Sequence, residues 1–198
     1  MNIGILALQG AFREHMVILD RLGLSSTAVR LPEQLKGVDA LILPGGESTT
    51  IGKLAASYDL LLPLRRFAAE KPVWGVCAGM ILLAKDVGMD QPLIGVMDVR
   101  VERNAFGRQV DSFETDLWIE DLPDGRHRPF PGVFIRAPRL TTTGSGVRIL
   151  ASLPGVGDVA ARQRQCLVTA FHPELTQDTR FHRYFIEMIE DNRKQAVV

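Results

Sequence analysis

A cysteine between two glycines is the part of this sequence that most clearly indicates chemistry. In Gly75-Val76-Cys77-Ala78-Gly79, an apolar run ends at the cysteine and a helix-like segment follows it. Flanking glycines permit the tight turn that lifts a nucleophile off the end of a sheet. The helix N-terminus favours the reactive thiolate, and the N–H of Ala78 points to where an oxyanion would form. The motif predicts a nucleophilic Cys77, although a structural cysteine between packing glycines fits it equally well.

A histidine and a glutamate further along the chain are the groups that a nucleophilic cysteine needs. Phe171-His172-Pro173-Glu174 follows an expected core strand, so His172 lies where a strand leaves the sheet. His172 would take the thiol proton, and Glu174 would orient the imidazole. Taken alone, so short a pattern fits a solvated turn started by Pro173 better. Its position after Cys77, with each motif ending a strand, favours a Cys-His-Glu triad.

A third motif, residues 43–50, places two glycines directly after a buried strand. Backbone amides in such a segment can approach a bound group closely. A phosphate cradle is one interpretation, but the segment lacks the Gly-Lys-Ser/Thr of a P-loop and the third glycine of a dinucleotide fingerprint. We therefore expect the Gly46 amide to be a second oxyanion donor opposite Cys77, with Glu47 and Ser48 holding a polar substrate.

These motifs require strands that end beside one another, and the first half of the chain has the pattern for them. Short apolar runs alternate with helix-like segments, which indicates βαβ units with right-handed crossovers and a doubly wound sheet. The expected strands lie at 3–8, 27–29, 40–43 and 73–76, and the expected helices at 12–22, 48–57, 61–70 and 78–85.

The second half of the chain changes to short strand candidates separated by turn residues, which predicts antiparallel hairpins. These candidates lie at 95–103, 113–119, 132–135, 148–150, 158–162 and 167–170. An amphipathic helix is expected over 179–191. Residues 122–131, from Leu122 to Pro131, are rich in Pro and Arg and are expected to form an exposed loop.

Composition limits the class of protein. The length of 198 residues, with no linker in it, predicts one domain over 1–198 with a flexible tail at about 192–198. Equal numbers of basic and acidic side chains, 23 each, argue against a nucleic-acid or membrane partner. Two cysteines cannot form a disulfide framework, Cys166 being expected to pack in a strand. The N-terminus lacks the basic start of a signal peptide, so we expect a soluble, cytoplasmic protein.

No metal or cofactor is expected. His15, His127 and His182 lack metal-ligand spacing with cysteines or carboxylates.

Seven short motifs resemble a single family, and the similarity runs in order from residue 1 to about 191. They are Leu8-Gln9-Gly10, Glu14-His15, Pro44-Gly45-Gly46-Glu47-Ser48-Thr49-Thr50, Cys77-Ala78-Gly79, Arg103-Asn104-Ala105-Phe106-Gly107-Arg108-Gln109, Phe134-Ile135-Arg136-Ala137-Pro138 and Phe171-His172-Pro173-Glu174-Leu175. The sequence is similar to the class I, triad-type glutamine amidotransferases, and within them to the glutaminase subunit of the ribose-phosphate-dependent pyridoxal 5′-phosphate synthase. The resemblance implies an α/β fold of three layers, flavodoxin-like, with a mostly parallel sheet and added antiparallel strands.

The resemblance also implies roles for individual residues. Cys77, His172 and Glu174 would be the triad, and Cys77 would attack the side-chain amide of L-glutamine to give ammonia and a glutamyl thioester. The residues expected to contact glutamine are Gly46, Glu47, Ser48, Arg103, Ile135 and Arg136. Either arginine could pair with the α-carboxylate in a bidentate manner. Without the surrounding motifs, a surface ion pair would be the expectation for each.

A protein partner follows from the same resemblance: a (β/α)8-barrel synthase subunit that consumes the ammonia. Free ammonia is wasted as ammonium, so docking should switch on the glutaminase, and the Gln9-Gly10 loop at a strand end is the candidate for that switch. The alternative is that this loop is a simple strand-to-helix turn. The sequence departs from the family pattern at Val76, where many relatives have threonine, and in the longer segment after Leu122.

Two other functions remain open at this point. A stand-alone γ-glutamyl hydrolase, or another Cys-His hydrolase of similar fold, would use the same nucleophile without a partner. A flavodoxin-like binding module that has lost its activity would use none of these groups. The presence of Cys77, His172 and Glu174 together argues against the second alternative.

Overall fold

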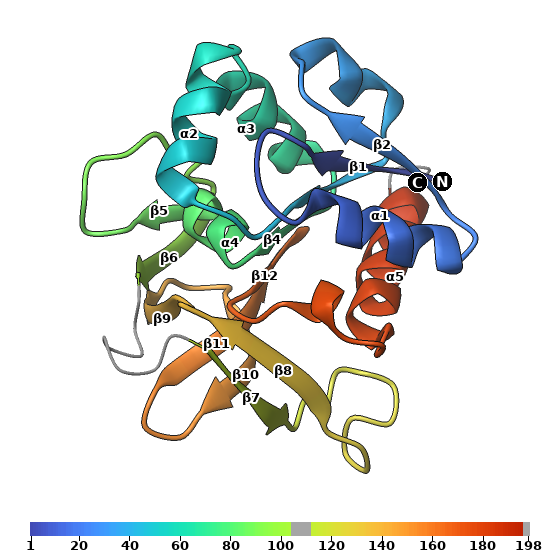
Figure 1. The fold of residues 1–198 in the computed structure, drawn as a ribbon, viewed down its shortest axis with the longest axis vertical. Coiled ribbons are helices and arrows are strands. Elements are labelled where there is room, and N and C mark those ends of the chain that lie inside the picture. Colours follow the sequence, from blue (N-terminus) through green and yellow to red (C-terminus); the bar gives the residue numbers. More distant parts are fainter. Residues whose placement is uncertain (104–111, 196–198) are drawn as a thin grey trace.

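Five parallel strands form the centre of the fold in this computed structural model, which describes residues 1–103 and 112–195. They are β1 (Asn2–Leu6), β2 (Ser25–Val29), β3 (Ala40–Leu43), β4 (Val73–Val76) and β12 (Cys166–Thr169). Their order in the sheet is β2-β1-β3-β4-β12, and every neighbouring pair is parallel. This is the flavodoxin-like order of a doubly wound sheet, so the predicted fold class is confirmed (Figure 1).

Antiparallel strands from the second half of the chain extend this sheet beyond β12, as predicted. β11 pairs antiparallel with β12, β10 and β9, and β9 pairs antiparallel with β6. The edge strand β5, from the first half of the chain, pairs parallel with β6, while β7 and β8 form a separate hairpin. The bounds are β5 (Ala84–Asp86), β6 (Met97–Glu102), β7 (Ser112–Leu117), β8 (Phe130–Ile135), β9 (Arg139–Thr143), β10 (Arg148–Leu153) and β11 (Gly157–Gln163). The sequence did not predict β5 or β9, because β5 is three residues long and β9 has a single apolar side chain.

Helices cover both faces of the parallel sheet. Figure 1 places α1 and α5 together on one side, and groups α2, α3 and α4 on the other. The helices are α1 (Phe12–Arg21), α2 (Ser48–Ser57), α3 (Leu61–Glu70), α4 (Ala78–Leu83) and α5 (Arg180–Gln195), with short 3₁₀ helices η1 (Pro32–Gly37) and η2 (Pro173–Leu175). None of the described helices is long and apolar enough to cross a membrane.

Two consecutive residues of β4 explain this division into layers. Successive side chains of a strand point to opposite faces of the sheet. Trp74 is fully buried against Phe181 and Phe185 of α5. Gly75 points the other way, where a Cβ atom would meet the backbone of Gly79 in α4. The large side chain therefore anchors one layer of helices, and the missing side chain lets α4 approach the sheet on the other face.

The segment predicted to be an exposed loop is partly buried, so that expectation was wrong for some of its residues. Leu122 is 4% exposed and Phe130 is fully buried as the first residue of β8. The guanidinium of Arg180 draws the segment in, because it donates to the carbonyl oxygens of Pro123, Arg128 and Pro129 at 2.7–3.3 Å. An apolar residue before an Arg/Pro-rich run and another after it were the signals that it folds back onto the core.

Loss of Arg180 should destabilise the protein, because Arg180 holds residues 122–131 against the core. The residue is 5% exposed and also forms an ion pair with Asp178, with Nη2 to Oδ2 at 2.6 Å. Arg180→Met leaves the carboxylate and the loop carbonyls without their donor, and we expect the free energy of unfolding to fall by about 3 kcal/mol. Urea unfolding measures this, with Arg183→Met as the control, since Arg183 is exposed on the same helix. Equal stability of the two variants would contradict the prediction.

The C-terminal helix is longer than expected. α5 continues to Gln195, four residues past the predicted end, and residues 196–198 of the expected tail lie outside the described residues.

Candidate active site

The three sequence motifs meet because their strands are neighbours in the sheet. β3, β4 and β12 are adjacent and parallel, so the segments that follow them emerge at the same edge. Gly45 follows β3, Cys77 follows β4 and His172 follows β12. In doubly wound sheets the crevice outside the carboxyl ends of the strands is where ligands bind. Residues that are far apart in the chain therefore share one site.

Cys77 has the strained backbone of a nucleophile elbow. Its φ of 48° is positive, a region that non-glycine residues seldom adopt. The flanking glycines are required by close approach: a Cβ on Gly75 would meet Gly79, and a Cβ on Gly79 would meet the carbonyl of Leu43 in β3. The N–H of Cys77 donates to the carbonyl of Thr169 in β12 at 2.8 Å. The turn is thus held between two strands, with the side chain 7% exposed.

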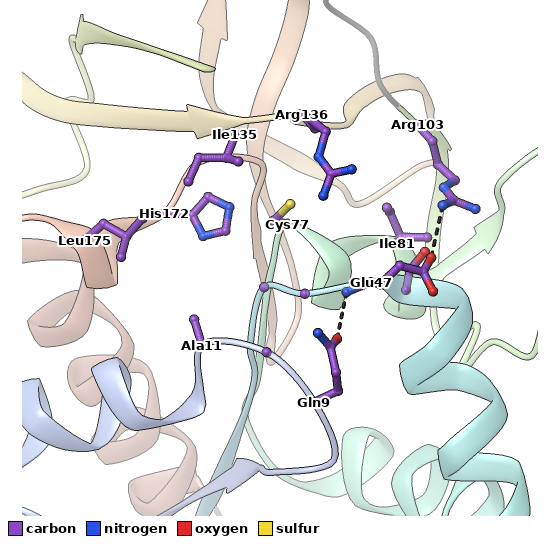
Figure 2. A pocket seen from close by; sticks show the side chains of 14 residues that line it. Gln9, Ala11, Glu47, Cys77, Ile81, Arg103, Ile135, Arg136, His172 and Leu175 are labelled. Atoms are coloured by element: carbon purple, nitrogen blue, oxygen red, sulfur yellow. Dashed lines mark hydrogen bonds and ion pairs between the residues drawn. The ribbon is translucent and has the colours of Figure 1, made fainter. Parts of the chain in front are cut away.

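His172 and Glu174 form a buried pair next to the cysteine. Glu174 Oε1 accepts from His172 Nδ1 at 2.7 Å, and the two residues are 7% and 6% exposed. The N–H of His172 donates to Val133 of β8, so the β7–β8 hairpin helps to fix the histidine. A Cβ on Gly45 would collide with the imidazole, which accounts for a glycine there. Figure 2 shows His172 and Cys77 facing the same cavity.

Electrostatics at this pair favour a charged imidazole. Burial by itself lowers the pKa of His172, but hydrogen bonds to Cys77 and Glu174, together with the charges of both, outweigh it and raise that pKa to about 10. Burial raises the pKa of Glu174, yet the adjacent His15 ring, the hydrogen bond from His172 and the charge of His172 lower it overall. The carboxylate is therefore ionised at neutral pH, and the imidazole readily holds a proton taken from the thiol.

A cavity of about 370 Å³ opens above Cys77 and collects most of the predicted site residues (Figure 2). Its lining includes Gln9, Gly10, Gly46, Glu47, Ser48, Cys77, Arg103, Ile135, Arg136 and His172. Two predicted residues do not line it: Ala78 is buried beneath the cysteine as the first residue of α4, and Glu174 is buried behind His172. The motif residues 104–109 lie outside the described residues.

Glu47 has a structural task that the sequence did not reveal. It is the N-cap of α2, and its carboxylate accepts from the N–H groups of Thr49 and Thr50 at 3.1 and 2.7 Å. The Thr50 hydroxyl, with these amides, lowers the pKa of Glu47 to about 2. The same carboxylate forms an ion pair with Arg103, Nη2 to Oε1 at 3.3 Å. Glu47 and Arg103 therefore partly neutralise each other on one wall of the cavity.

Arg136 differs from Arg103 in having no ion-pair partner within the part of the chain that the structure describes. It follows β8 and has a positive φ of 42°. Strained backbone conformations of this kind cluster at functional sites. In Figure 2 its guanidinium extends into the cavity near Cys77, and Ile135 lies beside it. The cavity thus has one cation without an ion-pair partner, counted over the described lining residues, and in Figure 2 it lies between Cys77 and the Glu47–Arg103 pair.

The Gln9-Gly10 loop contacts the glycine-rich segment directly. Gln9 Oε1 accepts from the N–H of Glu47 at 2.8 Å, and the N–H of Ala11 donates to the carbonyl of Gly45 at 3.0 Å. Gly10 has a φ of 100°, and a Cβ there would collide with Gly45. The end of β1 and the end of β3 are therefore locked together at the place where the strand order reverses.

Several residues at the site were not assigned a role by the sequence: Ala11 and Ile81 line the cavity, and Gln91, His15 and His182 lie next to it or behind it. Gln91 accepts from the hydroxyl of Thr49 at 3.1 Å and lies between Arg103 and Ser48, but it follows no helix or strand pattern that could have indicated it. His15 and His182 are buried behind Glu174. Both occupy apolar helix faces, at helical spacing from core residues, which is the signal that they are internal. Among the described residues, no group of three or more His, Cys, Asp or Glu side chains is placed to hold a metal ion.

Solved structures place this arrangement in a class. A crystal structure of a glutamine amidotransferase matches 95% of this chain and 98% of its own, with a TM-score of 0.88 and 51% sequence identity. A glutamine amidotransferase from Thermotoga maritima has the same fold, with a TM-score of 0.59 at 14% identity over 100% of this chain and 86% of its own. The fold of this chain is therefore that of the class I glutamine amidotransferases.

Sequence comparison identifies the family within that class. The chain belongs to the SNO glutamine amidotransferase family, whose model matches residues 5–191. It is 56% identical to the pyridoxal 5′-phosphate synthase subunit PdxT of Herpetosiphon aurantiacus over 94% of this chain and 99% of that protein. A second relative with the same name, from Pelotomaculum thermopropionicum, is 56% identical over 94% of both chains.

Proposed function

We propose that this chain is the glutaminase subunit of a pyridoxal 5′-phosphate synthase, hydrolysing L-glutamine to L-glutamate and ammonia through Cys77, His172 and Glu174. The observation that carries the proposal is the strained Cys77 next to the buried His172–Glu174 pair, at the floor of a cavity. The near-full-length similarity to subunits named PdxT supports the choice of this synthase over other ammonia users.

The chemistry would run through a thioester. The Cys77 thiolate attacks the side-chain carbonyl carbon of glutamine, and the N–H groups of Ala78 and Gly46 stabilise the oxyanion. The His172 imidazolium donates its proton to the departing nitrogen, which leaves as ammonia. Water then attacks the thioester carbonyl, His172 takes a proton from that water, and glutamate leaves as the thiol forms again. Glu174 holds the imidazole by its Nδ1–H throughout.

Charges of both signs in the cavity lining suit a zwitterionic amino acid. Arg136, which has no ion-pair partner among the described residues, would bind the α-carboxylate in a bidentate manner. Glu47 would bind the α-ammonium, with Arg103 keeping its carboxylate in place. Ser48 and Ile135 would border the aliphatic part of the substrate. No metal or cofactor enters the proposal.

The two tasks of Glu47 can be separated by substitution. Glu47→Ala removes the cap of α2 and the partner of the α-ammonium, so we expect about 1 kcal/mol less stability together with a raised KM for glutamine. Glu47→Asp keeps a capping carboxylate with a shorter reach, so its KM should rise while its stability stays close to wild type. Because the pKa of Glu47 is lowered to about 2, the capping contribution is present above about pH 4.5 and is lost as pH falls towards 2. Urea unfolding and steady-state kinetics test this, and an unchanged KM in both variants would contradict the binding role.

The proposed partner is a synthase subunit with a (β/α)8-barrel fold that receives the ammonia directly, in a complex located in the cytoplasm. The test is glutamate release from L-glutamine by the wild-type chain, with and without that subunit. We expect turnover to depend on the partner. Equal turnover in both conditions would instead favour a stand-alone γ-glutamyl or other Cys-His hydrolase, and no turnover in either would favour a binding module.

Gln9 is the proposed link between docking and catalysis. It holds the N–H of Glu47, one residue after the expected oxyanion donor Gly46. Gln9→Ala should free this segment and reduce the activation by the partner by about tenfold, the equivalent of one hydrogen bond of about 1.4 kcal/mol. Activation is measured as the ratio of glutaminase rates with and without the synthase subunit, with Leu31→Ala as an exposed control. An unchanged ratio in Gln9→Ala would mean that the loop is only a turn.

A further inference from the structure

Two histidines that the mechanism does not use are buried directly behind the triad. His15 of α1 is fully buried and His182 of α5 is 1% exposed. His15 Nε2 lies 3.6 Å from Glu174 Oε2, and His15 Nδ1 lies 3.1 Å from His182 Nε2. Trp74 of β4 packs edge-on against both rings, with centroid distances of 5.6 and 5.0 Å. The side chains from Glu174 to His182 therefore form one continuous buried row.

Three buried polar atoms in this row have no hydrogen-bond partner among the described residues. Glu174 uses Oε1 for His172, while its buried Oε2 has no hydrogen-bond partner among the described residues. His15 Nε2, which faces that oxygen, also has none, and the same holds for His182 Nδ1. Buried polar groups without partners are uncommon in folded proteins. The two orphaned atoms of Glu174 and His15 are aimed at each other.

The protonation state of the two histidines determines which of their ring nitrogens can donate a hydrogen bond. Burial lowers the pKa of His15, and burial, together with the neighbouring His15 ring, lowers that of His182 well below its usual value. Both rings are therefore neutral at pH 7, and each carries one N–H. If His182 donates its Nε2–H to His15 Nδ1, then the proton of His15 must be on Nε2, where it faces Glu174. This arrangement gives Glu174 a second donor.

We propose that His15 and His182 are positioning residues for the glutaminase reaction: His15 donates its Nε2–H to Glu174 Oε2, and His182 holds His15 in that tautomer. The inference rests on the proposed function, since it assigns the two histidines to the same triad. Two donors on different oxygens fix the plane of the carboxylate, so Oε1 stays aligned with His172 Nδ1. The 3.6 Å contact is long for a hydrogen bond, as catalytic contacts often are before substrate binds, and it should tighten in the substrate complex.

Other ionisable groups around the row must be taken into account. His172 lies on the cavity side of Glu174, and Cys77 lies beyond His172. Against the effect of burial, Glu174 and then Glu14 of α1 raise the pKa of His15, while His172 lowers it. Arg13 and Arg21 of α1 line a shallow pocket next to Glu174, from which its side chain is screened by complete burial. On α5 the facing group is His182, and on β4 it is the uncharged Trp74. His15 is therefore the group whose removal should act on Glu174 directly.

His15→Leu is the first test variant, measured as glutaminase activity in the complex with the synthase subunit. We expect kcat to fall by about 10–100-fold, as when a group that orients a catalytic side chain is lost, with KM unchanged because His15 does not line the cavity. Loss of the donor raises the pKa of Glu174, which must be ionised, so the acid limb of the kcat profile should move to higher pH by about one unit. His15→Gln retains an N–H donor and should recover most of the rate.

Leu19→Ala is the matched control, because it weakens the packing of the same helix at a fully buried position without changing any donor. All variants are assayed well below their thermal midpoints. Leu19→Ala should keep the wild-type acid limb. If His15→Leu folds, is active and keeps that limb too, the proposal is wrong, and the same follows if His15→Gln is no better than His15→Leu.

His182 provides a second, independent test. If it acts only through His15, then His182→Leu should lower kcat less than His15→Leu does, and the double variant should match His15→Leu. Additive losses would overturn the proposal, because two separate packing defects add.

Alkylation of Cys77 by iodoacetamide against pH separates this inference from the proposed function. If the acid limb of the alkylation rate shifts in His15→Leu, the positioning role of His15 is supported even if wild type releases no glutamate. An unshifted alkylation limb in an enzyme that hydrolyses glutamine normally would reject the row and leave the glutaminase intact.

Discussion

Cys77→Ala is expected to abolish the release of glutamate while the protein stays folded. Without the sulfur no thioester can form, and the remaining oxyanion donors and substrate contacts cannot replace a nucleophile. Removal of the nucleophile of a triad costs about 10⁶-fold in kcat, so the rate in the presence of the synthase subunit should fall below detection. Glutamate release from L-glutamine measures this result, and near-ultraviolet circular dichroism reports the fold.

Cys166→Ala is the matched control for that experiment. Cys166 is the second free cysteine, 5% exposed in β12, and burial raises its pKa to about 12, which makes it unreactive at neutral pH. This variant should keep the wild-type rate apart from a modest loss of stability. Activity that survives Cys77→Ala, or disappears in Cys166→Ala, would contradict the assignment of the nucleophile.

The strained backbone at Cys77 also predicts how substitutions there affect stability. A φ of 48° costs of the order of 1 kcal/mol or more for a residue with a Cβ, and glycine adopts it freely. Cys77→Gly should therefore be inactive and yet at least as stable as Cys77→Ala in urea unfolding. A lower stability of the glycine variant would mean that the elbow is not strained.

Glu174→Gln is expected to lower kcat by about 10⁴-fold, the cost of an uncharged amide at the third position of a triad. The carboxylate accepts the Nδ1–H of His172 at 2.7 Å, which leaves Nε2 for the thiol proton. A glutamine that presents its NH₂ group to Nδ1 reverses that tautomer and removes the charge that stabilises the imidazolium. KM should change little, because Glu174 does not line the cavity.

The same substitution should change how kcat depends on pH. The pKa of Glu174 is lowered, so in the wild type the carboxylate stays ionised throughout the neutral range and its contribution is lost only as pH falls through that lowered value. Glu174→Gln has no such titration, so its small residual rate should lack the acid limb that belongs to Glu174. Glu187→Gln removes a carboxylate from the exposed side of α5 and should behave as wild type. A residual rate that keeps the wild-type acid limb would mean that Glu174 is not the group responsible for it.

The elements that carry the site could be read from local patterns. Apolar runs flanked by helix-like segments predicted β1, β3, β4 and the helices between them, because a buried parallel strand and an amphipathic helix each have their own periodicity. The elbow was predictable for the same reason: Gly75 and Gly79 stand at fixed offsets from Cys77, and their small size is needed for contacts within a few residues or with the next strand. Short polar strands such as β9 carry no comparable pattern.

Contacts between distant segments were decided by the tertiary structure. Adjacency of β3, β4 and β12 brings Gly46, Cys77 and His172 to one edge, and strand order is a property of the whole sheet that no local window contains. Packing of α1 beside α5 places His15 and His182 behind Glu174. From the sequence, both were histidines without metal-ligand spacing, and His15 was part of a family motif with no role assigned to it.

The sequence by itself determined which groups are present and which of them sit at the ends of elements, since both follow from residue type and short-range spacing. Only the folded chain decided what each group faces. The carboxylate of Glu47, predicted from its motif to hold substrate, is also a helix cap and an ion-pair partner of Arg103, whereas Arg136 is left with its guanidinium in the cavity. The reason is physical: hydrogen bonds and ion pairs depend on distances of a few ångströms between side chains, and packing sets those distances.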